Sequence, residues 1–102
     1  MALLFISEYR NMATDAFGKP IPIGEEPAVV TQVVAVTTPS TPSAAFNSST
    51  RFIKMHSDTT CHIEFGTAPV AVAATDHRLV AGTTEFFGVI PGSALKVACI
   101  TP

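Results

Sequence analysis

The sequence predicts an all-β fold, a small β-sandwich or jelly-roll-like domain with an extended N-terminal arm. No window of a dozen residues keeps apolar side chains at the spacing of an amphipathic helix, whereas Val, Thr, Ile and Phe recur in short runs. Clusters of Pro, Gly and Ser separate these runs at intervals of about 8 to 12 residues, a spacing typical of sandwiches and small barrels. We therefore expect about seven or eight short strands.

The first strand is predicted at residues 3–9, and an arm follows it. Three prolines within residues 20–27 remove backbone donors that a regular ladder needs, so this segment is expected to be extended or polyproline-like. The predicted division of the chain is an N-terminal strand and arm over residues 1–27 and a β-sandwich domain over residues 28–102. Removal of residues 1–24 is accordingly expected to leave a folded β-domain.

Residues 28–38 predict the next strand, which is apolar on both faces near its middle. Such a strand is expected to be central in a sheet or covered on both sides. The prolines and serines of residues 39–43 end it. The further strands are predicted at 50–56, 60–65, 70–74, 78–81, 85–90 and 95–100.

Alternation assigns faces to two of these strands. Ile53 and Met55 share one face of their strand, and Cys61, Ile63 and Phe65 share one face of the next. The opposite face of that second strand carries His62 and Glu64, which predicts solvent or a partner on that side. Cys61 and Cys99 both fall on apolar faces and are expected to be small buried hydrophobic residues. A disulfide between them is possible if their strands are adjacent, but it is not predicted.

Charge and motifs argue against several function classes. Only 14% of residues are charged and the net charge is −2, so we expect neither nucleic acid nor a membrane as partner. The apolar start of the chain has no basic segment before it and is too short to span a bilayer. We therefore expect the protein to act, or to be assembled into a larger particle, in the compartment where it is synthesised.

No catalytic set is recognisable, so we predict no enzyme and no cofactor. No Gly-x-Ser-x-Gly elbow surrounds any serine, and the glycines form no phosphate loop. His56 and His62 flank a predicted hairpin in which they would be cross-strand neighbours, and His77 lies further along the chain. Their spacing does not indicate convergent ligands, and no metal site is predicted.

The arm is the most informative segment. Its apolar residues Phe17, Ile21 and Ile23 lie where prolines prevent a regular sheet interior, so they either dock on a neighbouring subunit or fold back onto their own domain. A small chain with few charges and surplus apolar surface favours docking or self-association. The candidate partner-binding residues are Phe5, Tyr9, Phe17, Ile21 and Ile23.

Four segments carry a resemblance to a known family: Phe5-Ile6-Ser7-Glu8-Tyr9, Gly24-Glu25-Glu26-Pro27-Ala28, Thr50-Arg51-Phe52-Ile53 and Glu85-Phe86-Phe87-Gly88-Val89-Ile90-Pro91-Gly92. In these segments and their order, the chain resembles a family of small virion proteins of tailed bacteriophages. The resemblance covers most of the chain, although none of the segments is chemically diagnostic.

The resemblance implies a capsid decoration, or cement, protein. Such a protein binds the outside of the phage head and stabilises contacts between subunits of the major capsid protein. Its implied partners are that capsid protein and further copies of itself, and it is assembled in the host cytoplasm. The alternative is a receptor- or carbohydrate-binding module or adaptor on the tail or spike, which the absence of tryptophan favours less. A small hydrolase or metal-dependent enzyme is a third alternative and needs a convergent polar pocket.

Overall fold

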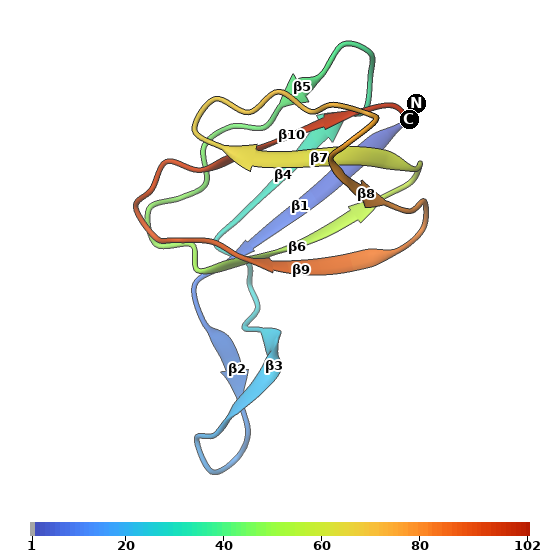
Figure 1. Cartoon of the computed structure of the whole chain (residues 1–102). Helices are drawn as coiled ribbons and strands as arrows, with labels where there is room; N and C mark the ends of the chain where they lie inside the picture. The colour runs from blue at the N-terminus through green and yellow to red at the C-terminus, as the bar shows by residue number, and fades with distance from the viewer. Residues whose placement is uncertain (1) are drawn as a thin grey trace.

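The computed structural model describes residues 2–102 and confirms the all-β class, with no helix in that range. Two four-stranded antiparallel sheets, β4-β1-β6-β9 and β5-β10-β7-β8, form a sandwich, and the β2-β3 hairpin projects from one end of it (Figure 1). The strands are β1 (Leu3–Tyr9), β2 (Met12–Thr14), β3 (Pro20–Gly24), β4 (Val30–Ala35), β5 (Thr41–Pro42), β6 (Phe52–Ser57), β7 (Cys61–Gly66), β8 (His77–Leu79), β9 (Thr84–Gly88) and β10 (Lys96–Ile100).

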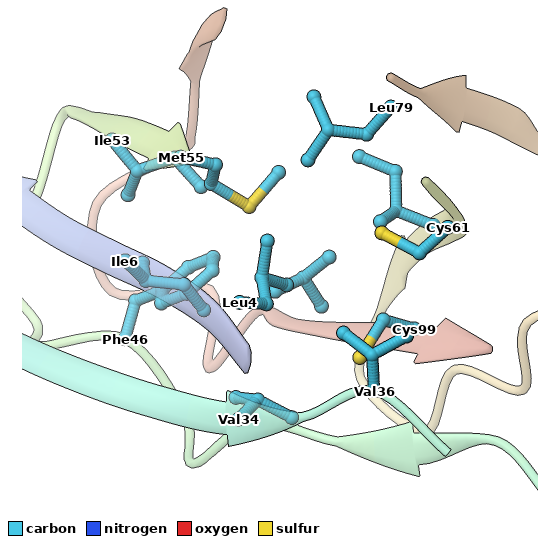
Figure 2. Packing of buried hydrophobic residues seen from close by; sticks show 12 residues of the cluster. Leu4, Ile6, Val34, Val36, Phe46, Ile53, Met55, Cys61, Leu79 and Cys99 are labelled. Atoms are coloured by element: carbon cyan, nitrogen blue, oxygen red, sulfur yellow. The ribbon is translucent and has the colours of Figure 1, made fainter. Parts of the chain in front are cut away.

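The core lies between the two four-stranded sheets and follows the alternation of the sequence. Buried side chains come from every second position of the long strands, such as Ile53 and Met55 on β6 and Cys61 and Ile63 on β7. Figure 2 shows side chains of the first sheet facing those of the second. The cluster consists of Leu4, Ile6, Val34, Val36, Phe46, Ile53, Met55, Cys61, Ile63, Leu79, Val97 and Cys99.

The outer face of the second sheet is covered by a loop. Ala98 points away from the core side of β10 yet is fully buried, and it lies opposite Glu64 of β7. The Glu64 carboxylate accepts a hydrogen bond from the Val70 amide (3.1 Å), and the Ser40 hydroxyl accepts one from the Ala71 amide (2.9 Å). Residues 70–74 were predicted as a strand, but they form this covering loop instead.

A strand does lie within residues 28–38, but the prediction that it is central in its sheet or covered on both sides is wrong, because β4 is an edge strand. Its apolar inner face packs in the core through Val34, while Val33 points outward and is exposed. Apolar residues on both faces therefore did not mark a strand with neighbours on both sides.

The first strand belongs to the sandwich rather than to an arm. β1 lies between β4 and β6 and pairs with both, each over six residues. The predicted boundary after residue 27 thus separates two neighbouring strands of one sheet. Removal of residues 1–24 would delete an inner strand, so the projecting part is only the segment from residue 11 to residue 25.

A buried carboxylate secures the loop that returns from the second sheet to the first. Glu8, at an inward position of β1, is fully buried. Its Oε1 accepts hydrogen bonds from the Asn47 amide (2.7 Å) and the Thr50 hydroxyl (2.8 Å), and its Oε2 accepts one from Gln32 Nε2 (3.1 Å). Every partner donates, which is the arrangement that an ionised carboxylate requires.

Candidate partner-binding hairpin

The projecting hairpin, residues 11–25, is a two-stranded ribbon, so the segment that the sequence predicted to be extended or polyproline-like is extended and pairs with β2. The Glu25 amide donates to the Asn11 carbonyl (3.0 Å), and the Asp15 amide donates to the Lys19 carbonyl (2.8 Å). These two bonds show that the backbone N–H and C=O groups of the odd-numbered residues of β3 point toward β2. The pairing register shifts between the two ends of the hairpin. Pro20 and Pro22 therefore occupy positions whose missing N–H groups would point outward, where proline is tolerated.

The tip of the projecting hairpin is held in one conformation. Asp15 Oδ1 accepts hydrogen bonds from the amides of Phe17 (2.8 Å) and Lys19 (3.0 Å). The Asp15 carbonyl accepts a third from Gly18, whose φ of 79° suits glycine. This turn presents Phe17 to solvent with 88% of its surface exposed.

The base of the projecting hairpin is clamped by Tyr9. Its ring stacks on Phe52 with 5.2 Å between centroids, and its hydroxyl donates to Glu26 Oε2 (2.7 Å). A Cβ on Gly24 would lie 2.4 Å from the Tyr9 ring, so only glycine allows this approach. Burial and, next, the hydrogen bond to Glu26 raise the pKa of Tyr9. The orientation of the hairpin is therefore set by packing at its base.

The structure separates the five predicted partner-binding residues into three environments. Phe17 and Ile23 are exposed on the projecting hairpin, with Ile21 half-buried on the same strand. Phe5 lies on the outer face of the first sheet, 41% exposed. Tyr9 is only 2% exposed, so its predicted role as a contact residue does not fit; it positions the hairpin instead.

Sequence reasoning missed several exposed apolar residues, and three of them lie on the projecting hairpin or on the outer face of the first sheet. Met12 lies on β2, opposite Gly24, and adds to the apolar surface of the projecting hairpin. Val33 and Phe86 lie on the outer face of the first sheet, where Val33 is opposite Phe5. The apolar residues on both faces of residues 28–38 did indicate that Val33 has an unusual environment. Its exposure could be predicted only with the knowledge that β4 lies at the edge of its sheet.

A pocket of about 260 Å³ lies where the projecting hairpin joins the sandwich. It is lined by Arg10, Asn11, Glu25, Pro27, Ala28 and Val29. The lining contains no aromatic ring on which a sugar would stack, and no His, Cys or Ser for nucleophilic chemistry.

The three histidines do not converge. His56 Nδ1 lies 3.1 Å from the Thr84 hydroxyl on the first sheet, and His77 Nε2 lies 3.2 Å from Glu85, joining β8 to β9. The predicted pairing of His56 with His62 is wrong, because the turn after Ser57 carries the chain from one sheet to the other. Within residues 2–102, no group of three or more His, Cys, Asp or Glu side chains is arranged to hold a metal ion.

The two cysteines lie on adjacent strands of the second sheet and are free and buried. Burial raises the pKa of Cys61. Burial and, next, electrostatic repulsion from a Cys61 thiolate raise the pKa of Cys99 to about 12, so neither thiol ionises readily. Neither thiol has the thiolate character of a nucleophile.

Comparisons of the chain with protein-family models, with curated proteins and with solved structures found no match. No helix that could cross a membrane occurs in the part of the chain from residue 2 to residue 102.

Proposed function

We propose that this chain is a structural virion protein of a tailed phage, a capsid decoration protein that attaches to the outside of the head. The projecting hairpin is its anchor to the major capsid protein. The observation that carries the proposal is a fixed turn at the far end of the hairpin that presents a single, almost fully exposed phenylalanine. The virion context comes from the resemblance of the sequence segments quoted above.

The form of the projecting hairpin supports a docking role. An isolated two-stranded ribbon is marginally stable in water, yet this one carries exposed Met12, Phe17 and Ile23. Burial of one such side chain contributes about 1.5–3 kcal/mol, so insertion of the tip between capsid subunits would stabilise the complex. The molecule, with the hairpin included, is 46 Å long along its longest axis, and this length suits contact with more than one capsid subunit.

The first test is cryo-electron microscopy of the virion whose genome encodes this chain. Density for a small β-sandwich repeated over the head, with the projecting hairpin against the capsid surface, is the expected result. Density at the tail or spike would replace the proposal with the adaptor or receptor-binding alternative. Absence from the particle would overturn both.

A binding assay on heads that lack the protein isolates the hairpin. Phe17→Ser is expected to weaken head binding at least about tenfold, because the lost burial is worth more than 1.4 kcal/mol. Val80→Ser is the matched control, since Val80 is also an exposed apolar residue but lies outside the hairpin. A larger deletion replaces residues 12–24 by Asn-Gly, which the existing bond between Asn11 and Glu25 allows to close. Unchanged binding of both hairpin variants would refute the anchoring role.

A further inference from the structure

The β4 strand leaves a row of backbone groups without partners in its own chain. The Val36 amide donates to the Ala2 carbonyl, which continues the β1-β4 register and identifies the even-numbered residues of β4 as the hydrogen-bonded set. The amides and carbonyls of Thr31 and Val33 therefore point away from β1. No hydrogen bond within residues 2–102 uses these groups, and both residues are exposed.

Among the four outer strands of the sandwich, β4 alone is long and carries no feature of its own that blocks strand addition. Only beyond Val33 does the chain use this side, where the Ala35 carbonyl accepts a hydrogen bond from Cys99 Sγ (3.7 Å) and the Thr37 carbonyl accepts one from the Thr101 amide (3.2 Å). β5 has two residues and contains Pro42, and β8 has three residues, including the exposed Arg78. β9 points the charged Glu85 inward and ends at Gly88. β4 is six residues long with neither a charge nor a proline. Natural sheets protect open edges by the devices that β4 lacks, so an unprotected edge indicates a partner.

The side chains beside this edge favour a second copy of the same chain as that partner. Val33 is 54% exposed, and across the ladder it faces Phe5, also exposed. Two copies of an uncharged strand meet without electrostatic repulsion. Antiparallel pairing of identical strands satisfies a two-fold axis, in which each residue makes the same contact in both copies.

We infer that two copies of this chain pair through antiparallel β4 strands, so that the two first sheets form one continuous eight-stranded sheet. In this register Val33 faces Val33 of the second copy, and Thr31 faces Ala35, whose carbonyl also accepts a hydrogen bond from Cys99 Sγ within its own chain (3.7 Å). The pairing satisfies the open groups of Thr31 and Val33 and brings Val33 and Phe5 of both copies into one apolar stripe on the outer face. The inference goes beyond the proposed function and does not depend on it.

Proline substitutions test the edge directly. The Val33 amide makes no bond within the monomer, so Val33→Pro removes only the donor that the second copy needs. Phe86→Pro is the matched control, because Phe86 is 52% exposed and its amide faces the open side of β9, as the bond from the Val89 amide to the Arg51 carbonyl shows. In sedimentation velocity over a dilution series, the wild type and Phe86→Pro are expected to be dimers. Val33→Pro is expected to dimerise at least about tenfold more weakly, since two hydrogen bonds are lost per dimer.

A cysteine variant keeps the test valid if a proline disturbs folding. Val33→Cys is expected to form a covalent dimer on mild oxidation, since directly opposed residues in a hydrogen-bonded pair lie about 5.5 Å apart at Cα, within disulfide range. Phe86→Cys should stay monomeric on a denaturing gel, and the native thiols do not interfere because both are buried. A wild type that sediments as a monomer at every concentration would overturn the inference. So would a dimer that Val33→Pro leaves intact, or one that Val33→Cys does not cross-link.

Discussion

Replacement of the buried Glu8 by glutamine should be among the most costly conservative changes in this protein. Glu8→Gln keeps the shape of the side chain but replaces one acceptor oxygen by an NH₂ group. The two donors on Oε1, Asn47 and Thr50, can still find a carbonyl oxygen. The new NH₂ group would then face Gln32 Nε2, another donor. Gln32 cannot simply turn over, because its Oε1 accepts the Ala44 amide at 3.0 Å.

The magnitude follows from these bonds. Hydrogen bonds to a charged group contribute about 1.5–3 kcal/mol and neutral ones about 1 kcal/mol. Two bonds are therefore weakened, and the bond from Gln32 Nε2 to Glu8 is lost while the half-buried Gln32 Nε2 keeps only its bond to the Ala44 carbonyl (3.4 Å). The sum is a loss of about 2–4 kcal/mol in the free energy of unfolding. A domain of this size has a total stability of about 5–15 kcal/mol. The corresponding fall in Tm is roughly 10 to 25 °C.

Urea unfolding followed by far-ultraviolet circular dichroism, together with calorimetry, measures this loss. The chain lacks tryptophan, so fluorescence is the weaker probe. Glu25→Gln is the control, because it makes the same change in net charge at an exposed side chain. If Glu8→Gln unfolds within about 0.5 kcal/mol of this control, the three hydrogen bonds do not secure the return loop and the reasoning is wrong.

Three further predictions concern the hairpin base and the thiols. Gly24→Ala should cost about 1–3 kcal/mol in urea unfolding, because its Cβ would lie 2.4 Å from the Tyr9 ring; Gly88→Ala, with nothing within 4 Å, should cost little. Because the folded state raises the pKa of Tyr9 above its ordinary 10.0, this group's stabilising contribution is complete below pH 10 and declines as the pH rises above it. Stability measured between pH 9 and pH 11 should therefore fall less steeply in Tyr9→Phe, and equal slopes would contradict the role of Tyr9. Cys61 and Cys99 should resist a thiol reagent at about pH 8 until urea unfolds the chain, when both react; rapid labelling of the native protein would argue against their burial.

Much of the fold was predictable because side chains alternate along a strand whatever its partners. The faces of β6 and β7 agree with the predicted patterns, since Ile53, Met55, Cys61 and Ile63 are all in the core. Glu8 could have been found in the same way, because it shares the alternation of Leu4 and Ile6. The prolines of β3 indicated an extended segment but did not reveal its pairing with β2, since in a two-stranded ribbon the outward positions tolerate a missing donor.

The candidate site was predictable only in part. Phe17 and Ile23 are exposed on the projecting hairpin, as expected for docking residues, whereas Tyr9 is buried at its base. The sequence shows that Tyr9 directly precedes the arm. It does not show that the Tyr9 ring packs against Gly24, where any other side chain would clash with it. Val33 and Phe86 could not be assigned, because exposure on an outer face depends on what the rest of the chain covers.

The sequence by itself therefore determined the all-β class, the inward and outward faces of individual strands and the location of a projecting segment near the N-terminus. These properties follow from local periodicity and from the conformational preferences of proline and glycine. Only the tertiary structure decided that β1 is an inner strand, that β4 is an unprotected edge and that the turn after β6 crosses between sheets. Strand partners such as Ser7 and Lys54 are distant in sequence, and backbone hydrogen bonding between strands is largely blind to side-chain identity.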